Sequence, residues 1–461
     1  MNYRPKTQMN YIQKEVLEKL KKQNKAIIAN ECGTGKSKSA IDGMLYHLND
    51  TDKKVLVLAP TFEIATNWKS EVEKHCYDGW AFIGSEFNSA NKLCASSRNN
   101  RSAQLKWLDN ALRYSTSDIN RFIIMQADTL KIKSVHNILN DLIDEEYIGG
   151  IICDEAHKLV NVETQRTEAY LKLGKPRYEY MLTATPVRNY FNDMFMYCSR
   201  LGISVPHYAA TYNDFKQTFT EKGKTGRPCG NRNYRLLKEC ISPYLIQYGK
   251  EFLVDELPRL NEYNYHINNA EEINGKIREI LDGYTETCAL AIMTQAEKAA
   301  FIYKGESANQ LIFSLLMSGK QVVVFSRFTE QLEYIKFGAK LNCSCSAEKI
   351  HREVEEFKKG NTRVICSTYG CLGAGIELCP ATEIIILDEP WTQADIEQAV
   401  SRIHRLSNPN PVCNIHYIRL PKSVDGHIHK IVHNKGVTGT FNDNKKFFGD
   451  DELLNEERIK F

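Results

Sequence analysis

The sequence predicts an α/β protein made of two tandem lobes, each built on a parallel β-sheet, with a helical, basic insertion between them. Short β-branched apolar runs alternate with longer amphipathic stretches, which is typical of parallel sheets covered by helices on both faces. The runs gather in the two halves of the chain and are scarce between residues 191 and 300. A length of 461 residues suits two or three domains, at a usual size of about 150 residues each.

The predicted strands and domains follow from these runs. Strands of the first lobe are expected at residues 26–29, 55–59, 122–125, 150–153 and 180–183. Strands of the second lobe are expected at residues 321–325, 363–366, 383–387 and 412–417. The predicted domains are a first lobe over 1–190, a helical protrusion with a basic loop over 191–262, a linker over 263–300 and a second lobe over 301–461.

Composition excludes several classes of protein. Sixty lysines and arginines face 57 aspartates and glutamates, so the net charge is only +3, which argues against a uniformly basic, DNA-coating protein. A 42% share of apolar residues suits a globular chain. No apolar run approaches the ~18 residues of a membrane span, and the first residues do not resemble a signal peptide. We therefore expect no membrane, and a place in the cytoplasm or nucleoid, or in the host cytoplasm if the source is viral.

The 14 cysteines include no CxxC pair. The CxC formed by Cys343 and Cys345 has no second pair or histidine cluster at zinc spacing. We therefore expect reduced, mostly buried thiols, with a metal site as the alternative.

A phosphate-binding loop follows the first predicted strand and precedes a helical stretch over 38–48. Two glycines let backbone N–H groups approach phosphates, Lys36 reaches the β- and γ-phosphates, and the Ser37 hydroxyl binds Mg²⁺. Asn30 stands where the generic pattern has its first glycine. The loop predicts ATP and Mg²⁺ as cofactors, held by Cys32, Gly33, Thr34, Gly35, Lys36 and Ser37. A chance match on a surface turn is the alternative, and the acidic motif described next argues against it.

Two adjacent acids follow the predicted strand over 150–153. Asp154 is expected to bind Mg²⁺ through water, and Glu155 is expected to polarise the attacking water. His157 is a candidate for coupling the γ-phosphate to movement. Thr183 and Thr185 lie at the end of the next predicted strand and are candidates for the same coupling. An ordinary transition from a strand to a turn is the alternative.

The second lobe supplies a further set of polar residues. Gln398, Arg402 and Arg405 have the spacing i, i+4, i+7 and are expected on one face of a helix, where they would clamp a transferred phosphoryl group. A solvated helix face is the alternative.

The insertion carries a basic stretch. Residues 221–250 have seven lysines and arginines against two glutamates. This stretch is either a solvated insertion or a surface that contacts phosphates. The candidate contacts are Lys222, Lys224, Arg227, Arg232 and Arg235.

These motifs, in this order on two lobes, resemble superfamily 2 helicase-type motors with a DEAH motif, and more narrowly the SWI/SNF-type ATPases. Residues 29–37 resemble the family's A-D-E-M-G-L-G-K-T loop, and residues 182–189 resemble its L-T-G-T-P-x-x-N motif. The second lobe resembles three further motifs of the family, at residues 367–378, 388–391 and 398–405. The short insertion is similar to that of a small, distant branch that includes annealing helicases and phage or bacterial members. Glu377 departs from the family, which has Asn or Asp there.

The resemblance implies two RecA-like lobes with ATP in the cleft between them. Catalytic roles would fall to Lys36, Asp154, Glu155, Gln398, Arg402 and Arg405. Gln8 would contact adenine, and Gly375 would lie near the nucleotide. The nucleic-acid track would include Thr61, Trp68, Ser326, Arg327, Thr368 and Trp391.

The expected function is a DNA-stimulated ATPase and double-stranded DNA translocase that remodels or reanneals branched DNA. We expect a monomeric motor whose partner is duplex or branched DNA. Two alternatives remain open at this point: a helicase that separates strands of DNA or RNA, and a non-catalytic, ATP-gated DNA-binding subunit of a larger complex.

Overall fold

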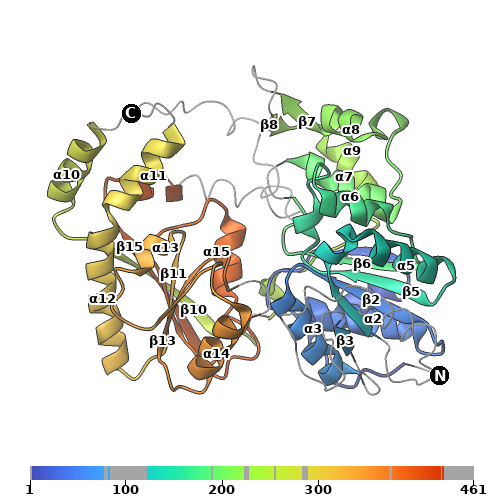
Figure 1. The fold of residues 1–461 in the computed structure, drawn as a ribbon, viewed down its shortest axis with the longest axis horizontal. Helices are drawn as coiled ribbons and strands as arrows, with labels where there is room; N and C mark the ends of the chain where they lie inside the picture. Colours follow the sequence, from blue (N-terminus) through green and yellow to red (C-terminus); the bar gives the residue numbers. More distant parts are fainter. Residues whose placement is uncertain are drawn as a thin grey trace. The chain divides into compact units, whose positions relative to one another are not determined.

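The computed structural model describes residues 3–76, 81–83, 122–187, 190–222, 228–253, 256–282, 289–372, 376–426 and 428–429. The chain folds into two compact units, the first ending at Leu253 and the second beginning directly after it. Each unit has a parallel sheet with helices packed against it (Figure 1). The predicted α/β class with two parallel-sheet lobes is confirmed.

The sheet of the first unit has the strand order β3-β4-β2-β5-β6-β1-β9, and every neighbouring pair is parallel. Its strands are β1 (Lys25–Ile28), β2 (Lys54–Ala59), β3 (Ala81–Ile83), β4 (Phe122–Gln126), β5 (Ile148–Cys153), β6 (Tyr178–Leu182) and β9 (Leu245–Ile246). The five strands predicted for this lobe are all present. Because they are parallel, their carboxyl ends meet at one edge of the sheet, where the predicted phosphate loop and acidic motif lie.

Helices of the first unit fill both faces of this sheet. Helix α1 (Tyr11–Leu20) precedes β1, and the helices that follow strands are α2 (Lys36–Leu48), α3 (Phe62–His75), α5 (Lys133–Asp144) and α6 (Gln165–Lys172). Helix α1 begins with a capping box, in which the Asn10 side chain accepts from the backbone of Gln13 and the Gln13 side chain accepts from the backbone of Asn10. Short 3₁₀ helices lie at Ala127–Lys131, Ala156–Leu159, Phe191–Asp193, His207–Ala209 and Lys250–Leu253.

The insertion is built onto the first lobe. It contains α7 (Met194–Leu201), α8 (Tyr212–Phe219), α9 (Tyr234–Ile241) and an antiparallel pair, β7 (Thr220–Lys222) and β8 (Pro228–Asn231). Its buried apolar side chains, such as Phe215 and Leu237, belong to the same core as Ile27 and Met181 of the sheet. The insertion therefore has no separate core among the described residues, and it folds as part of the first unit.

The sheet of the second unit has the order β10-β15-β14-β11-β13-β12 and is also parallel throughout. Its strands are β10 (Arg259–His266), β11 (Val322–Ser326), β12 (Ala339–Leu341), β13 (Val364–Thr368), β14 (Glu383–Ile386) and β15 (Val412–Arg419). Its helices are α10 (Ala270–Asp282), α11 (Ala289–Ala299), α12 (Phe301–Met317), α13 (Thr329–Leu332), α14 (Ala347–Lys358) and α15 (Gln393–Val400). Val323 and Val324 lie in different cores on the two faces, as alternation along a doubly covered strand requires.

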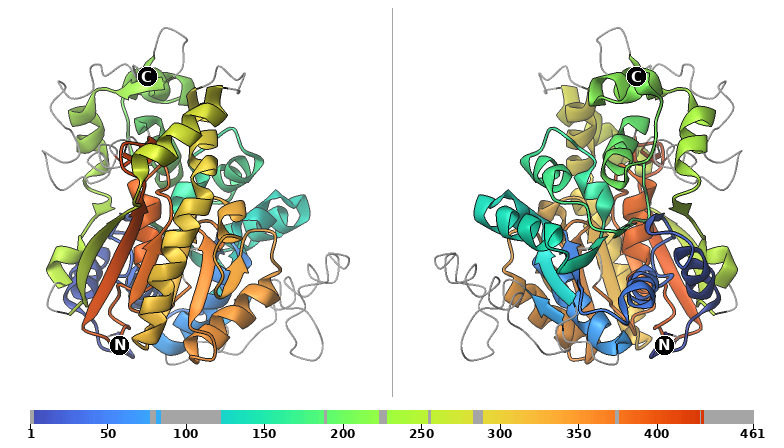
Figure 2. Two further views of the ribbon diagram at one scale, coloured as in Figure 1. Left: turned by 90° about the vertical axis from the view of Figure 1, so that its left-hand side faces the viewer. Right: turned by 90° about the vertical axis from the view of Figure 1, so that its right-hand side faces the viewer.

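The structure differs from the predicted domain boundaries around residue 260. Strand β10 pairs along its whole length with β15 and forms the edge of the second sheet (Figure 2). It therefore belongs to the second lobe rather than to the protrusion or the linker, and α10 and α11 occupy much of the predicted linker. Most of its side chains are exposed and polar, so β10 carries no apolar run that sequence analysis could detect. Within the described residues, no helix is both long and apolar enough to span a membrane.

Candidate active site

The phosphate loop joins β1 to α2 at the carboxyl edge of the first sheet. Gly33 and Gly35 have φ angles of +86° and +84°, a region that side chains other than glycine rarely adopt, so the loop requires glycine at both positions. Lys36 is the first residue of α2, and its Nζ donates to the carbonyl oxygens of Asn30 and Glu31 at 2.8 and 3.1 Å. The lysine therefore lies over the loop, where a bound phosphate could replace these carbonyls.

Asn30, which stands in the place of a glycine, braces the loop. Its side chain is fully buried, and its Oδ1 accepts from the backbone N–H of Tyr248 at 2.9 Å. The carboxylate of the next residue, Glu31, accepts from the backbone N–H of Lys250 at 3.2 Å. Where the generic pattern has a flexible glycine, Asn30 thus forms a hydrogen bond with the segment that follows β9.

Sequence analysis missed Gln13, which touches the loop. A Cβ atom added to Gly35 would lie 2.1 Å from Gln13 Nε2, so the amide of this buried glutamine packs directly against the loop. Asn10 Nδ2 also donates to the carbonyl oxygen of Thr34, at 3.4 Å. The Asn-x-x-Gln spacing, which is typical of a capping box, is the sequence feature that could have drawn attention to Gln13. Gln8, the predicted adenine contact, is exposed just before α1.

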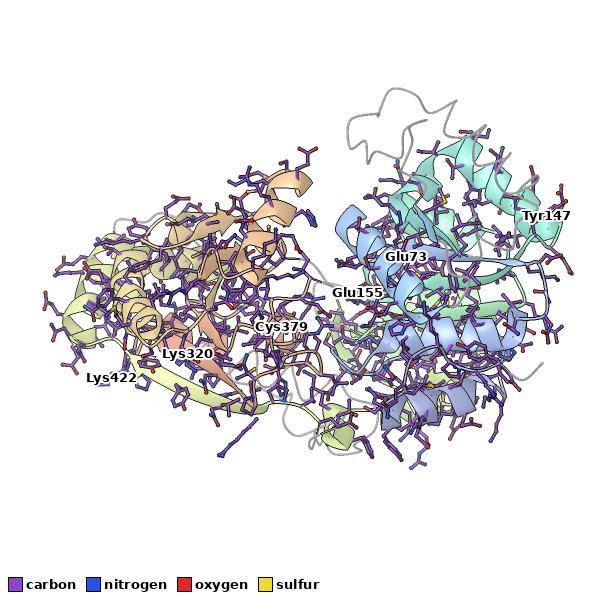
Figure 3. All side chains as sticks on the ribbon, turned by 90° about the horizontal axis from the view of Figure 1, so that it is seen from below. Glu73, Tyr147, Glu155, Lys320, Cys379 and Lys422 are labelled. Atoms are coloured by element: carbon purple, nitrogen blue, oxygen red, sulfur yellow. The ribbon has the colours of Figure 1, made fainter. Side chains whose placement is uncertain are left out.

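The acidic pair follows β5 at the same edge. Trp68 Nε1 donates to Asp154 Oδ2 at 2.8 Å, and the backbone N–H of Glu155 donates to Asp154 Oδ1 at 2.9 Å. Glu155 has a φ of +47°, a left-handed conformation that non-glycine residues seldom adopt. Its Oε2 lies 3.1 Å from His157 Nδ1. Figure 3 shows Glu155 at one end of its unit, with Tyr147, at the start of β5, at the other.

The candidate coupling residues are in contact with the acidic pair. His157 Nδ1 lies 3.1 Å from Thr183 Oγ1, and the backbone N–H of Thr185 donates to the same oxygen at 3.0 Å. The ends of β5 and β6 are therefore joined by side chains, from Glu155 through His157 to the turn after β6.

The two carboxyl groups have opposite pKa shifts. Burial raises the pKa of Asp154 to about 6, and repulsion from Glu155 adds to this, whereas the Trp68 hydrogen bond opposes it. Burial also acts to raise the pKa of Glu155, but the hydrogen bond and charge of His157, with Lys36 and Lys158, outweigh it and lower this pKa to about 2. Lys36 favours the ionised form of both acids, so the loop lysine and the acidic pair share one electrostatic environment.

The oxygen atoms of Ser37 and Asp154 are suitable ligands for a magnesium ion that a bound nucleotide also coordinates. A buried carboxylate beside a second carboxylate is stabilised by a cation, and oxygen donors are those that Mg²⁺ prefers. The described residues contain no cluster of three or more His, Cys, Asp or Glu that could hold a metal without further ligands. Ser37 and Asp154 could therefore hold the ion only with ligands from phosphates and water.

In the second unit, the predicted helical face is only partly present. Helix α15 ends at Val400, so Gln398 lies on it while Arg402 and Arg405 lie in the turns that follow. Arg402 is buried and its Nη1 donates to the carbonyl oxygen of Ile376 at 3.4 Å. Arg405 is more exposed and pairs with Glu377 at 2.9 Å. Gly375, predicted near the nucleotide, lies outside the described residues.

Three of the predicted nucleic-acid contacts, Trp68, Ser326 and Thr368, have buried side chains in this structure. Trp68 is 2% exposed, and its indole serves Asp154. Ser326 is fully buried and donates to Asp388 at 2.8 Å, and Thr368 is 8% exposed. Residue type alone does not show burial, so the sequence could not distinguish these roles. Thr61 is partly exposed and caps α3 by accepting from the N–H of Ile64.

Arg327 and Trp391 form a stacked pair. The guanidinium of Arg327 lies 4.7 Å from the ring centroid of Trp391 and 4.9 Å from that of Phe328. The same guanidinium donates to both carboxylate oxygens of the buried Glu297, at 2.9 and 3.1 Å. The charge of Arg327 is thus already paired within the second unit.

The basic stretch of the insertion is only partly described. Lys222, Arg232 and Arg235 are exposed, and none of the three forms an ion pair with another described residue. Lys224 and Arg227 lie outside the described residues. These positions suit either a solvated surface or a phosphate-binding one.

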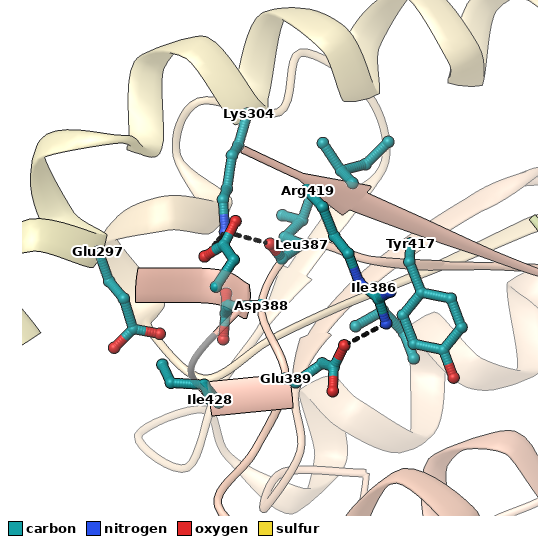
Figure 4. Close-up of a pocket in the computed structure, with 11 residues that line it drawn as sticks. Glu297, Lys304, Ile386, Leu387, Asp388, Glu389, Tyr417, Arg419 and Ile428 are labelled. Carbon is teal, nitrogen blue, oxygen red and sulfur yellow. Dashed lines mark hydrogen bonds and ion pairs between the residues drawn. The ribbon is translucent and has the colours of Figure 1, made fainter. Parts of the chain in front are cut away.

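A charged cavity in the second unit was not predicted. It has a volume of about 10 Å³, room for one water molecule, and Figure 4 shows its lining. Lys304 Nζ donates to Asp425 at 2.7 Å and to the carbonyl oxygen of Leu387 at 3.0 Å. Burial raises the pKa of Glu297 to about 7, against the opposing effect of Arg327.

Comparisons with known proteins cover most of the chain. The family described as SNF2-related domain matches residues 12–323, and the helicase conserved C-terminal domain matches residues 304–407. An uncharacterized ATP-dependent helicase of Mycoplasma pneumoniae is 23% identical over 94% of this chain and 42% of its own length. The DNA annealing helicase and endonuclease ZRANB3 of Bos taurus is 23% identical over 91% of this chain and 39% of its own length.

The chain thus spans less than half the length of either relative. Among solved structures, the Hef helicase domain of Pyrococcus furiosus aligns with a TM-score of 0.54 at 13% identity. The alignment covers 91% of this chain and 97% of that one, and it supports the two-lobe fold.

Proposed function

Since this chain belongs to the SNF2-related family of ATP-hydrolysing enzymes, we propose that it is a DNA-stimulated ATPase and a translocase on double-stranded DNA. The observation that carries the proposal is the arrangement at the carboxyl edge of the first sheet. There the phosphate loop with Lys36, the acidic pair and the His157–Thr183 contact lie together.

The residues of the first unit have separate roles in the proposed reaction. Backbone N–H groups of the loop bind the phosphates, and Lys36 exchanges its carbonyl partners for phosphate oxygens. Ser37 and Asp154 would hold Mg²⁺, which would supply charge neutralisation for the transferred phosphoryl group. Glu155, held ionised by His157, orients the attacking water and accepts its proton.

Movement would begin at the contact between His157 and Thr183. A change in the charge near Glu155 on hydrolysis alters the hydrogen bonds that join the ends of β5 and β6. We propose that Arg402 and Arg405 stabilise the transferred phosphoryl group, with Gln398 and the segment around Gly375 near the nucleotide.

DNA is the proposed partner, and remodelling or reannealing of branched DNA is the proposed use. Similarity to a relative named as a DNA annealing helicase supports this use. The proposal also assigns duplex phosphates to the exposed cations Lys222, Arg232 and Arg235 of the insertion, because such contacts are electrostatic and blind to sequence.

The experiment measures ATP turnover with no nucleic acid and with single-stranded DNA, duplex DNA, forked DNA and RNA, alongside a strand-separation assay. We expect duplex and forked DNA to stimulate turnover, with no strand separation of a plain duplex. Displacement of a third strand from a triplex would report translocation. Stimulation by single strands alone, together with strand separation, would overturn the proposal in favour of a helicase. Absence of turnover with every substrate would leave only a binding role.

A further inference from the structure

A group of basic side chains lies at the amino edge of the first sheet, opposite the edge that carries the phosphate loop. Lys22 and Lys25 lie where the chain passes from α1 into β1, and Lys175 and Arg177 lie in the segment that leads into β6. Strands β1 and β6 are neighbours in the sheet, with Lys25 paired in register to Glu179, so the two segments meet. We call these four residues the amino-edge surface.

Acidic groups lie near the four charges without forming ion pairs with them: the charge of Arg177 acts to lower the pKa of Glu146, and the charge of Glu179 acts to raise the pKa of Lys175. None of the four forms an ion pair with a described residue, whereas nearby Lys21, Lys53 and Lys172 each pair with a glutamate. Lys25 Nζ and Lys175 Nζ instead donate to carbonyl oxygens at the C-terminal end of α7, those of Leu201 at 3.2 Å and Ser199 at 2.9 Å. Lys25 and Lys175 therefore cap the C-terminal end of α7, which accounts for their presence at this edge. This capping explains neither Lys22 nor Arg177, which are both exposed.

Like charges crowd this edge. Partial burial lowers the pKa of Lys175, and the charges of Arg200 and Lys25 lower it further, against the opposing charge of Glu179. Burial likewise lowers the pKa of His47, and Arg177 adds to the effect. Crowded cations of this kind are relieved by a polyanion, which removes their mutual repulsion and releases its own counterions.

Aromatic rings accompany the cations. The guanidinium of Arg177 lies 5.4 Å from the ring centroid of the buried Tyr178. Next to the surface, Lys21 lies 5.4 Å from the ring centroid of the exposed Tyr46. Basic groups interleaved with aromatic rings are typical of surfaces that follow a nucleic-acid backbone.

We propose that the amino-edge surface binds the phosphodiester backbone of a second DNA segment while the motor acts on the first. The proposal rests on the proposed function, since it requires that the chain act on DNA. Thr61, a partly exposed candidate DNA contact of the first lobe, follows β2 at the carboxyl edge. A strand of six residues separates the two edges by roughly 20 Å, so one lobe offers two separate places for DNA. A protein that holds two duplex segments can bring together the arms of a branched molecule.

The test compares two variants of the full chain with equal loss of charge. The first replaces Lys22, Lys25, Lys175 and Arg177 with glutamine. The matched control replaces four exposed cations that each have a carboxylate partner, Lys276, Arg352, Lys358 and Lys359. Bridging is measured as energy transfer between two short duplexes, one carrying a donor dye and the other an acceptor. Thermal melting verifies that both variants are folded.

We expect the first variant to lose bridging and its control to keep it. The dependence of log affinity for DNA on log salt should flatten by up to about 3–4 units, since each phosphate contact contributes about 0.9. Duplex-stimulated turnover of ATP should remain, because these residues lie away from the phosphate loop. The double variant Lys22→Gln/Arg177→Gln, which leaves the α7 contacts intact, should show about half the change in slope.

Equal bridging by the wild-type chain and the folded first variant would overturn the inference. So would loss of bridging in the control as well, because the effect would then follow net charge alone. If the wild-type chain bridges no duplexes but a single duplex stimulates its ATP turnover, the second DNA-binding surface is refuted while the proposed motor function stands. A wild-type chain that no DNA stimulates overturns the proposed function itself.

Discussion

A buried carboxylate that serves a cation must be oriented before the cation arrives, and the indole of Trp68 does this for Asp154. The indole is itself buried on α3, and its N–H lies 2.8 Å from one carboxylate oxygen. The backbone of Glu155 holds the other oxygen. Both hydrogen bonds favour the ionised form, which burial disfavours.

Trp68→Phe should weaken the affinity for magnesium while keeping an apolar aromatic ring, although a smaller one, in the core. Loss of a hydrogen bond to a charged group costs about 1.5–3 kcal/mol, so the Mg²⁺ concentration for half-maximal turnover should rise about tenfold or more. The measurement is a magnesium titration of ATP turnover and of Mn²⁺ binding to the nucleotide complex. Trp391→Phe, which changes a tryptophan of the second unit, is the control. An unchanged magnesium titration in Trp68→Phe would contradict the positioning role.

Lys36→Ala and Glu155→Gln should both reduce turnover by at least about 100-fold but differ in nucleotide binding. Lys36 contacts phosphates in the ground state, whereas Glu155 acts on the attacking water. The Glu155 variant should therefore retain ATP, as measured with a fluorescent nucleotide. Equal and complete loss of binding in both variants would contradict the assigned roles.

At the scale of elements, helix α11 is joined to the end of β11 by the buried pair of Glu297 and Arg327. Helix α12 is joined to the ends of β14 and β15 by Lys304, through Leu387 and Asp425. Helices α11 and α12, which lie between β10 and β11 in the chain, are therefore held to the carboxyl edge of the second sheet by charged groups. Breaking one partner of such a pair leaves an uncompensated charge in the interior.

The unfolding free energy should fall as pH rises between about 4.5 and 7, because of Glu297. Burial raises its pKa to about 7, so in this range the folded chain binds a proton that the unfolded chain has lost. The contribution is at most about 3 kcal/mol. Urea unfolding at pH 5 and pH 8 measures it, and Glu297→Gln should reduce the pH dependence. Glu330→Gln, an exposed glutamate on α13, is the control, and identical pH dependence in the wild-type chain and Glu297→Gln would refute the assignment.

The elements that sequence analysis found are those whose signal is local. Strands such as β2 and β11 are buried on both faces and therefore read as continuous apolar runs. Strand β10 was not predicted because it is an exposed edge strand without an apolar run, and β9 was not predicted because it has only two residues. The loop and acid motifs were found because their chemistry fixes residue types at short spacing. The hydrogen bonds of Trp68 to Asp154 and of Ser326 to Asp388 could not be predicted, because the partners are distant in sequence.

At the scale of the whole molecule, the two units carry different parts of the proposed reaction. The first holds the loop and the acidic pair, and the second holds Arg402 and Arg405. Because their environments differ, the two arginines differ in how readily they can change hydrogen-bond partners. Arg402 is buried against the backbone, whereas Arg405 is held by the partly exposed carboxylate of Glu377 and can exchange it for a phosphate.

Arg405→Ala should reduce turnover by about 10³-fold with little change in nucleotide affinity, since an arginine of this kind acts mainly in the transition state. Steady-state kinetics and nucleotide binding measure the two effects separately. Arg352→Ala, on the exposed face of α14, should leave both unchanged. Normal turnover in Arg405→Ala would remove this residue from the reaction and leave Arg402 as the only candidate of the pair.

The order of strands in the second sheet has a consequence for biosynthesis. Among the described strands of its unit, β10 is the first to leave the ribosome, yet its one neighbour among them is β15, which begins at Val412. At about 5–20 residues per second, β10 waits roughly 7–30 s for its partner. An unpaired strand is a template for aggregation during such a wait. Its polar side chains, among them Arg259, Glu262 and His266, keep the nascent strand hydrated until the chain is long enough to close the sheet.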